Sequence, residues 1–165
     1  MHRTIFLELS SELSGYPSID LEGTGLVDQY FKLLNDEIGE SVAEILFSTS
    51  DEVLKLKGKA RLHAMEVEIT ASPLLWPVCQ SIIGLWYLGQ WMRMSANWYK
   101  YYAGINAPDS SVAPGKSFVP SAQAYTEQFS YKGAGAHPPG AHPTGFGSWG
   151  LDPLFGDFIT DNKNS

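Results

Sequence analysis

The chain has 165 residues, which is enough for one domain that buries a hydrophobic core without disulfides or metal ions. Hydrophobic residues make up 44% of it and charged residues 18%, and this composition excludes a disordered chain. The formal net charge is −7 and no basic face is visible, so we expect no nucleic acid as a partner. The aromatic share of 13% exceeds what a small core needs and indicates contacts with another protein.

Apolar residues at helical spacing predict an all-α fold, a small bundle of about five helices within residues 1–103. The turn sequence at 14–17 ends the first of these helices. The predicted helices span residues 4–13, 18–35, 38–47, 51–70 and 73–94.

The segment 73–94 is the most apolar part of the chain. Its length alone would suit a membrane span of ~20 residues. Gln80 and Gln90 interrupt it, Gly84 and Gly89 lower its helix propensity, and amphipathic helices precede it. We therefore expect a buried central helix and no transmembrane segment.

The character of the chain changes after residue 103. Residues 104–165 hold most of the Pro and Gly and show no sustained helical or strand period, yet aromatic residues recur throughout. A flexible linker would not carry so many aromatic side chains. We expect a long, irregular, aromatic-rich tail that lies on its own bundle or wraps a partner, within one structural domain overall.

The residue patterns that carry chemistry predict no catalytic residue, no cofactor site and no metal site in this chain. The sequence at 145–150 matches G-x-G-x-x-G, but no strand precedes it and no helix follows it. Cys79 lies in the most apolar segment, which predicts a buried, unreactive thiol. His137 and His142 flank a Pro-rich turn, and two imidazoles fall short of the three or four ligands of a metal site.

Several segments together resemble one protein family. The sequence IIGLWYLG at 82–89 resembles the I-x-x-A-W-Y-L-G core of the small (gamma) subunits of bacterial FAD-dependent sugar dehydrogenases, which act on glucose, fructose, sorbitol or gluconate. Residues 6–15 resemble the family's opening F-x-x-L-S-x-x-L-T-G, and residues 26–34 resemble its next helix. Residues 130–131 and 145–149 resemble its ending, S-Y-C…P-G-x-W. The resemblance covers most of the chain in the same order.

This resemblance implies a non-catalytic small subunit that stabilises and matures a large flavoprotein of the glucose-methanol-choline type. That partner holds the FAD and oxidises a sugar hydroxyl, while this chain holds no cofactor. A multihaem cytochrome c often accepts the electrons in the family. For such a complex we expect an interface of aromatic side chains: Trp86, Tyr87, Trp91, Trp98, Tyr125, Phe129, Tyr131, Phe146 and Trp149.

The chain also departs from the family pattern. It begins without the twin-arginine signal that these subunits usually bear, so we expect a cytoplasmic location for the chain as it stands, and a periplasmic one if such a signal has been removed. Lys132 stands where the family has Cys, so no interchain disulfide is expected there, and residues 133–144 form an insertion.

Two alternatives remain open at this point. The aromatic residues after Gly89 suit either a sugar-binding entrance or a hydrophobic partner contact, and interface composition favours the contact. The alternative function is a free-standing helical binding protein or a homo-oligomer without a flavoprotein partner.

Overall fold

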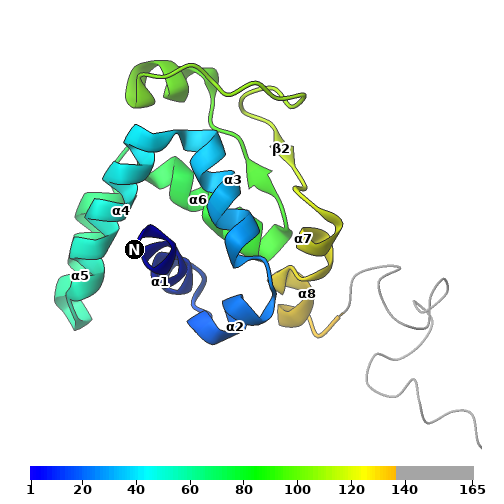
Figure 1. Cartoon of the computed structure of the whole chain (residues 1–165). Coiled ribbons are helices and arrows are strands. Elements are labelled where there is room, and N and C mark those ends of the chain that lie inside the picture. Colours follow the sequence, from blue (N-terminus) through cyan, green and yellow to red (C-terminus); the bar gives the residue numbers. More distant parts are fainter. Residues whose placement is uncertain (137–165) are drawn as a thin grey trace, which may run out of the picture.

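A computed structural model describes residues 1–136, and over this range the chain is mostly helical, as the sequence predicts (Figure 1). Two short strands form an antiparallel pair at one side of the helices. The elements are α1 (His2–Ser14), α2 (Ser18–Gly23), α3 (Val27–Ile38), α4 (Glu40–Lys55), α5 (Gly58–Ala64), the π-helix η1 (Met65–Thr70), α6 (Trp76–Leu88), β1 (Trp91–Met92), the π-helix η2 (Trp98–Ala103), β2 (Ser117–Phe118), α7 (Ala122–Thr126) and α8 (Phe129–Gly133).

Helix α1 ends where the sequence predicts, because Gly15 adopts a left-handed conformation and its N–H caps the carbonyl of Ser11. The helix predicted over 18–35 is wrong, since the chain breaks it into α2 and α3. At the break, the Thr24 hydroxyl donates to the carbonyl of Leu21 and accepts from an N–H of the next turn, and Gly25 has φ +70°. This local turn replaces the helical hydrogen bonds that a continuous helix would need.

The predicted boundary between residues 47 and 51 is also wrong, because α4 continues through it to Lys55. Ser50 is fully buried on α4 and does not cap a new helix. The break comes later, at Gly58, whose φ of +54° starts α5 in a new direction. Helix α5 then runs on into η1 without a gap.

The core lies around α1, which contacts α2, α3, α4 and α6. Tyr30 of α3 illustrates how tightly α3 and α6 pack. Its ring makes an edge contact with the ring of Trp86 at 4.8 Å between centroids, and its hydroxyl donates to the carbonyl of Leu85 at 3.2 Å. Both side chains are fully buried, so this contact fixes α6 against α3.

Helix α6 is central, but it is not buried on every side. Val78, Ile82 and Leu85 face the core, whereas Gln80 and Leu88 are exposed on the opposite side. In the described part of the chain, no helix is long and apolar enough to cross a membrane.

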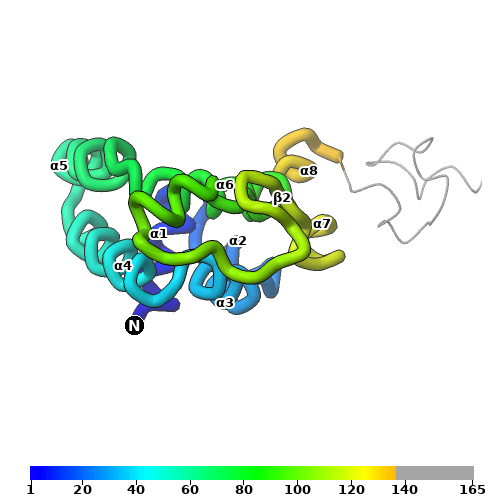
Figure 2. Tube along the Cα trace, turned by 90° about the horizontal axis from the view of Figure 1, so that it is seen from above, coloured from blue at the N-terminus to red at the C-terminus, as the bar shows by residue number. Residues whose placement is uncertain are grey.

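Residues 104–136 lie on their own bundle. Strand β2 pairs with β1 through Trp91 and Phe118, and α7 and α8 contact α6. Phe129 of α8 is fully buried and stacks on Trp86 at 5.9 Å between ring centroids. Seen from above, α7 and α8 gather at one end of α6 (Figure 2). The described part of the predicted tail therefore completes the core.

Candidate docking face

The nine aromatic residues predicted as a partner interface fall into three groups. Four of them, Trp86, Trp91, Trp98 and Phe129, are at most 3% exposed and belong to this chain's own core. Trp86, Trp91 and Phe129 would meet a partner only if that core opened, whereas Trp98 also lines a hollow at the surface. The predicted contacts at positions 146 and 149 lie outside the described residues.

The remaining three, Tyr87, Tyr125 and Tyr131, are reachable from the surface. Tyr87 is half-buried, and its hydroxyl donates to the carbonyl of Ser14 at 2.7 Å. Tyr125 is 37% exposed and makes an edge contact with Tyr131 at 6.0 Å between ring centroids. The structure brings Tyr125 and Tyr131 together at α7 and α8, beside the C-terminal end of α6. Their role as partner contacts stays a prediction.

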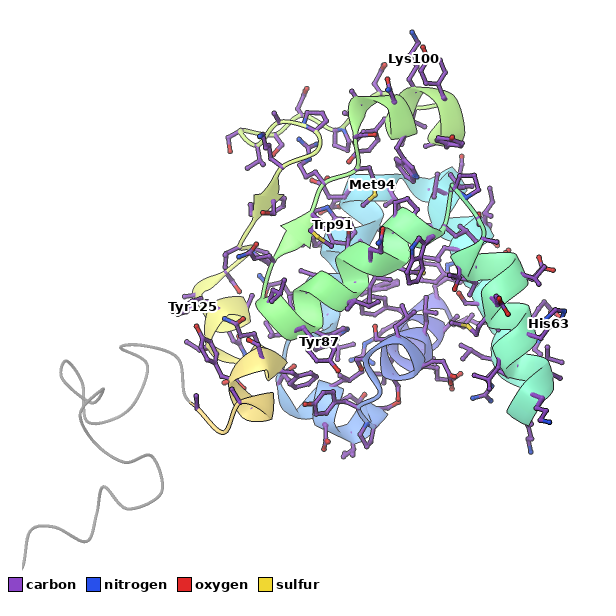
Figure 3. The ribbon with its side chains drawn as sticks, turned by 180° about the vertical axis from the view of Figure 1, so that it is seen from behind. His63, Tyr87, Trp91, Met94, Lys100 and Tyr125 are labelled. Carbon is purple, nitrogen blue, oxygen red and sulfur yellow. The ribbon has the colours of Figure 1, made fainter. Side chains whose placement is uncertain are left out.

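The outer side of α6 carries an open groove, which Figure 3 faces. Two adjacent hollows of about 410 Å³ and 380 Å³ share Gln80 and Met92 as lining residues, and the two together are here called the α6 groove. In that view α6 crosses the face of the molecule, with α3 and α4 behind it. Its apolar lining includes Pro73, Ile83, Tyr87, Leu88, Met92 and Tyr102.

Two glycines allow the chain to build this face. A Cβ on Gly84 would lie 3.1 Å from the carbonyl oxygen of Gln90, because the chain that leads into β1 passes directly over α6. Gly89 has φ +61°, and a Cβ there would lie 2.3 Å from the carbonyl oxygen of Ala124. The segment 82–89 thus contains two positions, Gly84 and Gly89, where neighbouring backbone passes too close to leave room for a side chain.

A buried ion pair sets the electrostatics beneath the groove. The Arg93 side chain is 1% exposed, and its Nε donates to Glu37 Oε2 at 2.9 Å. Tyr99 donates its hydroxyl proton to the same carboxylate oxygen at 3.1 Å, and burial raises the pKa of Tyr99 to about 12. The guanidinium also donates to the carbonyls of Pro108, at 2.7 Å, and Val112. Arg93 is therefore fully engaged in holding the loop after η2.

The described residues offer little nucleophilic or metal chemistry. Residues 1–136 contain no group of three or more His, Cys, Asp or Glu side chains placed to hold a metal ion. Cys79 is fully buried, as predicted, and burial raises the pKa of its thiol to about 12, so the thiol stays protonated near neutral pH. His137, His142 and the G-x-G-x-x-G sequence at 145–150 lie outside the described residues. The α6 groove can bind an apolar surface by excluding water.

Sequence reasoning missed the aliphatic members of this face, such as Ile83, Leu88 and Met92. One signal was available, because Trp76, Gln80, Ile83 and Tyr87 follow one another at spacings of four, three and four and must share one side of a helix. That spacing does not reveal which side stays uncovered, since the segment is apolar on both.

Comparison of the chain with protein-family models, with curated proteins and with solved structures finds no match.

Proposed function

We propose that this chain is the non-catalytic small subunit of a complex with a large FAD-dependent flavoprotein of the glucose-methanol-choline type. In this proposal the chain stabilises and matures that partner, which oxidises a sugar hydroxyl and passes electrons to an acceptor such as a cytochrome c. In this proposal part of the aromatic-rich segment after residue 103 also reaches the partner.

One observation carries the proposal. The segment 82–89, one of the stretches that resemble the family, contributes Ile83, Tyr87 and Leu88 to the lining of the groove. Ile82, Leu85 and Trp86 point into the core, whereas Leu88, 49% exposed, lines the groove on the outer side. If residues 82–89 served only to form the core, the outer side of α6 would not need to be apolar.

The composition of the groove supports a protein partner. Aromatic side chains and Met are enriched in the buried centre of protein interfaces, and Tyr102, Tyr87 and Met92 line this groove. The cofactor and the sugar then belong to the partner.

Two purifications test the proposal. Purified alone, the chain is expected to show no flavin absorbance and no dehydrogenase activity. Expressed together with the large flavoprotein, it is expected to copurify with it and to raise the yield of soluble, flavin-loaded, sugar-oxidising enzyme. Stoichiometric flavin in the isolated chain would contradict the proposal, and so would a monomer or homo-oligomer that leaves the flavoprotein unbound.

A further inference from the structure

The charges of the chain are divided unevenly between two parts of the molecule. Residues 1–70, which form α1 to η1, carry thirteen carboxylates and six Lys or Arg residues, and so account for a net charge of −7. Residues 71–126, which form α6, β1, η2, β2 and α7, carry one carboxylate, Asp109, and three basic residues. The part that builds the α6 groove is therefore close to neutral, with a small excess of positive charge.

The exposed positive charges of this second part lie on segments that adjoin residues of the groove wall. Arg93 is paired with Glu37 inside the protein, which leaves Lys100 and Lys116 at the surface. Lys100 lies on η2 at the tip of the molecule, two residues before Tyr102 of the groove wall (Figure 3). The backbone carbonyl of Lys116 accepts a hydrogen bond from the N–H of Arg93 at 2.9 Å, so this residue lies beside β1. Within residues 1–136, neither lysine has an ion-pair partner.

We propose that the α6 groove and these two lysines bind an apolar surface of the large flavoprotein that is bordered by carboxylates. The acidic helices α1 to α4 are then directed away from that surface. This inference rests on the proposed function and adds to it the docking face, the chemistry of the partner's surface and the orientation of the complex.

The apolar groove and the two lysines contribute differently to binding. Burial of the apolar groove supplies affinity, which is mainly expressed as slow dissociation. Lysines at the rim of an interface contribute to the association rate and to orientation, because complementary potentials steer the encounter. An acidic partner that approached α1 to α4 would meet like charge, so the orientation follows from the division of charge.

Purified variants of the full chain, with the purified large flavoprotein as probe, separate these contributions. Leu88→Glu places a charge in the groove at a position that is 49% exposed, so the fold is expected to tolerate it. Lys100→Glu with Lys116→Glu reverses the charge of the rim. The matched control is Lys57→Glu with Lys59→Glu, which makes the same charge change at the start of α5, on two lysines that are exposed and without an ion pair among residues 1–136.

Association and dissociation rates at low and physiological salt are the readout, with circular dichroism to verify each fold. Leu88→Glu is expected to weaken binding roughly thirtyfold or more, mainly through faster dissociation. The rim pair is expected to slow association about tenfold at low salt and to flatten its salt dependence. The control pair is expected to slow association much less than the rim pair does, because its charges lie away from the docking face and are screened.

The possible failures are distinguishable. If the unaltered chain binds the flavoprotein and folded Leu88→Glu binds as tightly, the docking face is wrong while the proposed function stands. If the control pair slows association as much as the rim pair does, the orientation is wrong. If the unaltered chain does not bind the flavoprotein, the proposed function is wrong, and this inference with it.

Discussion

Arg93 links three segments of the fold, because its guanidinium joins the end of β1 to α3 and to the loop after η2. We predict that Arg93→Met lowers the free energy of unfolding by about 3–5 kcal/mol, since it leaves the buried carboxylate of Glu37 without its counter-charge. Lys32→Met is the control, because its ion pair with Asp36 is exposed and worth at most ~1 kcal/mol. Urea unfolding measures both, and equal losses in the two variants would contradict this role.

The raised pKa values of Tyr99 and Cys79 predict how the stability of the fold changes at alkaline pH. Burial raises the pKa of Tyr99 from 10.0 to about 12, with the negative charge of Glu37 adding to it, and burial raises the pKa of Cys79 from 9.0 to about 12. Both groups are neutral when protonated, and the unfolded chain releases their protons at lower pH than the folded chain does. The contribution of these two groups to the free energy of unfolding is therefore intact below about pH 9 and is lost as the pH rises towards 12.

Urea midpoints at about pH 8 and about pH 11 test this dependence, and we expect the lower midpoint at the higher pH. Tyr99→Phe removes one of the two titrating groups, so its midpoint is expected to fall less between the same two pH values. Identical pH profiles for this variant and the unaltered chain would show that Tyr99 does not contribute.

At the scale of elements, the close approach of α6 and α7 depends on Gly89. We predict that Gly89→Ala destabilises the fold more than Gly15→Ala, although both residues have positive φ. At Gly15 nothing lies within 4 Å of an added Cβ, so the cost is the left-handed conformation alone, ~1–2 kcal/mol. At Gly89 the backbone of Ala124 stands in the way, which adds ~1–3 kcal/mol. Unfolding by urea gives the comparison, and equal losses would mean that α7 moves away at no cost.

Two truncations test how much residues 104–136 stabilise the bundle. A chain that ends at residue 103 loses Phe129, which covers Trp86, and the carbonyls of Pro108 and Val112 that accept hydrogen bonds from Arg93. We predict that it unfolds at markedly lower urea and loses cooperativity, whereas a chain that ends at residue 136 keeps the described fold. A 1–103 chain as stable as the 1–136 chain would show that residues 104–136 are dispensable for the bundle.

Some features were predictable from local sequence and others were not. The end of α1 follows from Gly15, which acts within one turn. The course of α4 does not, because Ser50 has the sequence character of a cap and is instead buried against the core. The aromatic residues present the same difficulty on a larger scale. Trp86 and Phe129 are of residue types that are enriched in interfaces. Residue type alone does not distinguish a contact with a partner from a place in the chain's own core.

For the candidate site, the sequence identifies the helical segment that contributes to the groove, but it does not show which side of that helix stays exposed. The helical spacing of Trp76, Gln80, Ile83 and Tyr87 places them on one side of α6. Whether this side stays open depends on the positions of β1, η2 and α7. Those positions are set by contacts between elements. In one of them, the Ser81 hydroxyl of α6 donates to the carbonyl of Met92 in β1 at 2.6 Å.

At the scale of the whole molecule, an acidic part formed by α1 to η1 adjoins a nearly neutral part that carries the α6 groove. This arrangement suits a subunit that presents one face to a partner and keeps the other in water. With the tail included, we expect the complex to bury well over ~2,000 Å² in total, the range of permanent assemblies.

Isolation of the complex through a tag on this chain, in cells that also express the large flavoprotein, is the decisive measurement. The absorbance spectrum and the sugar-oxidising activity of the isolated material are recorded, and light scattering gives its mass. We predict a stable assembly larger than this chain alone, with bound flavin that oxidises a sugar. A tagged chain that elutes as a monomer or homo-oligomer without flavin, beside an active flavoprotein that it does not bind, would contradict the proposed function.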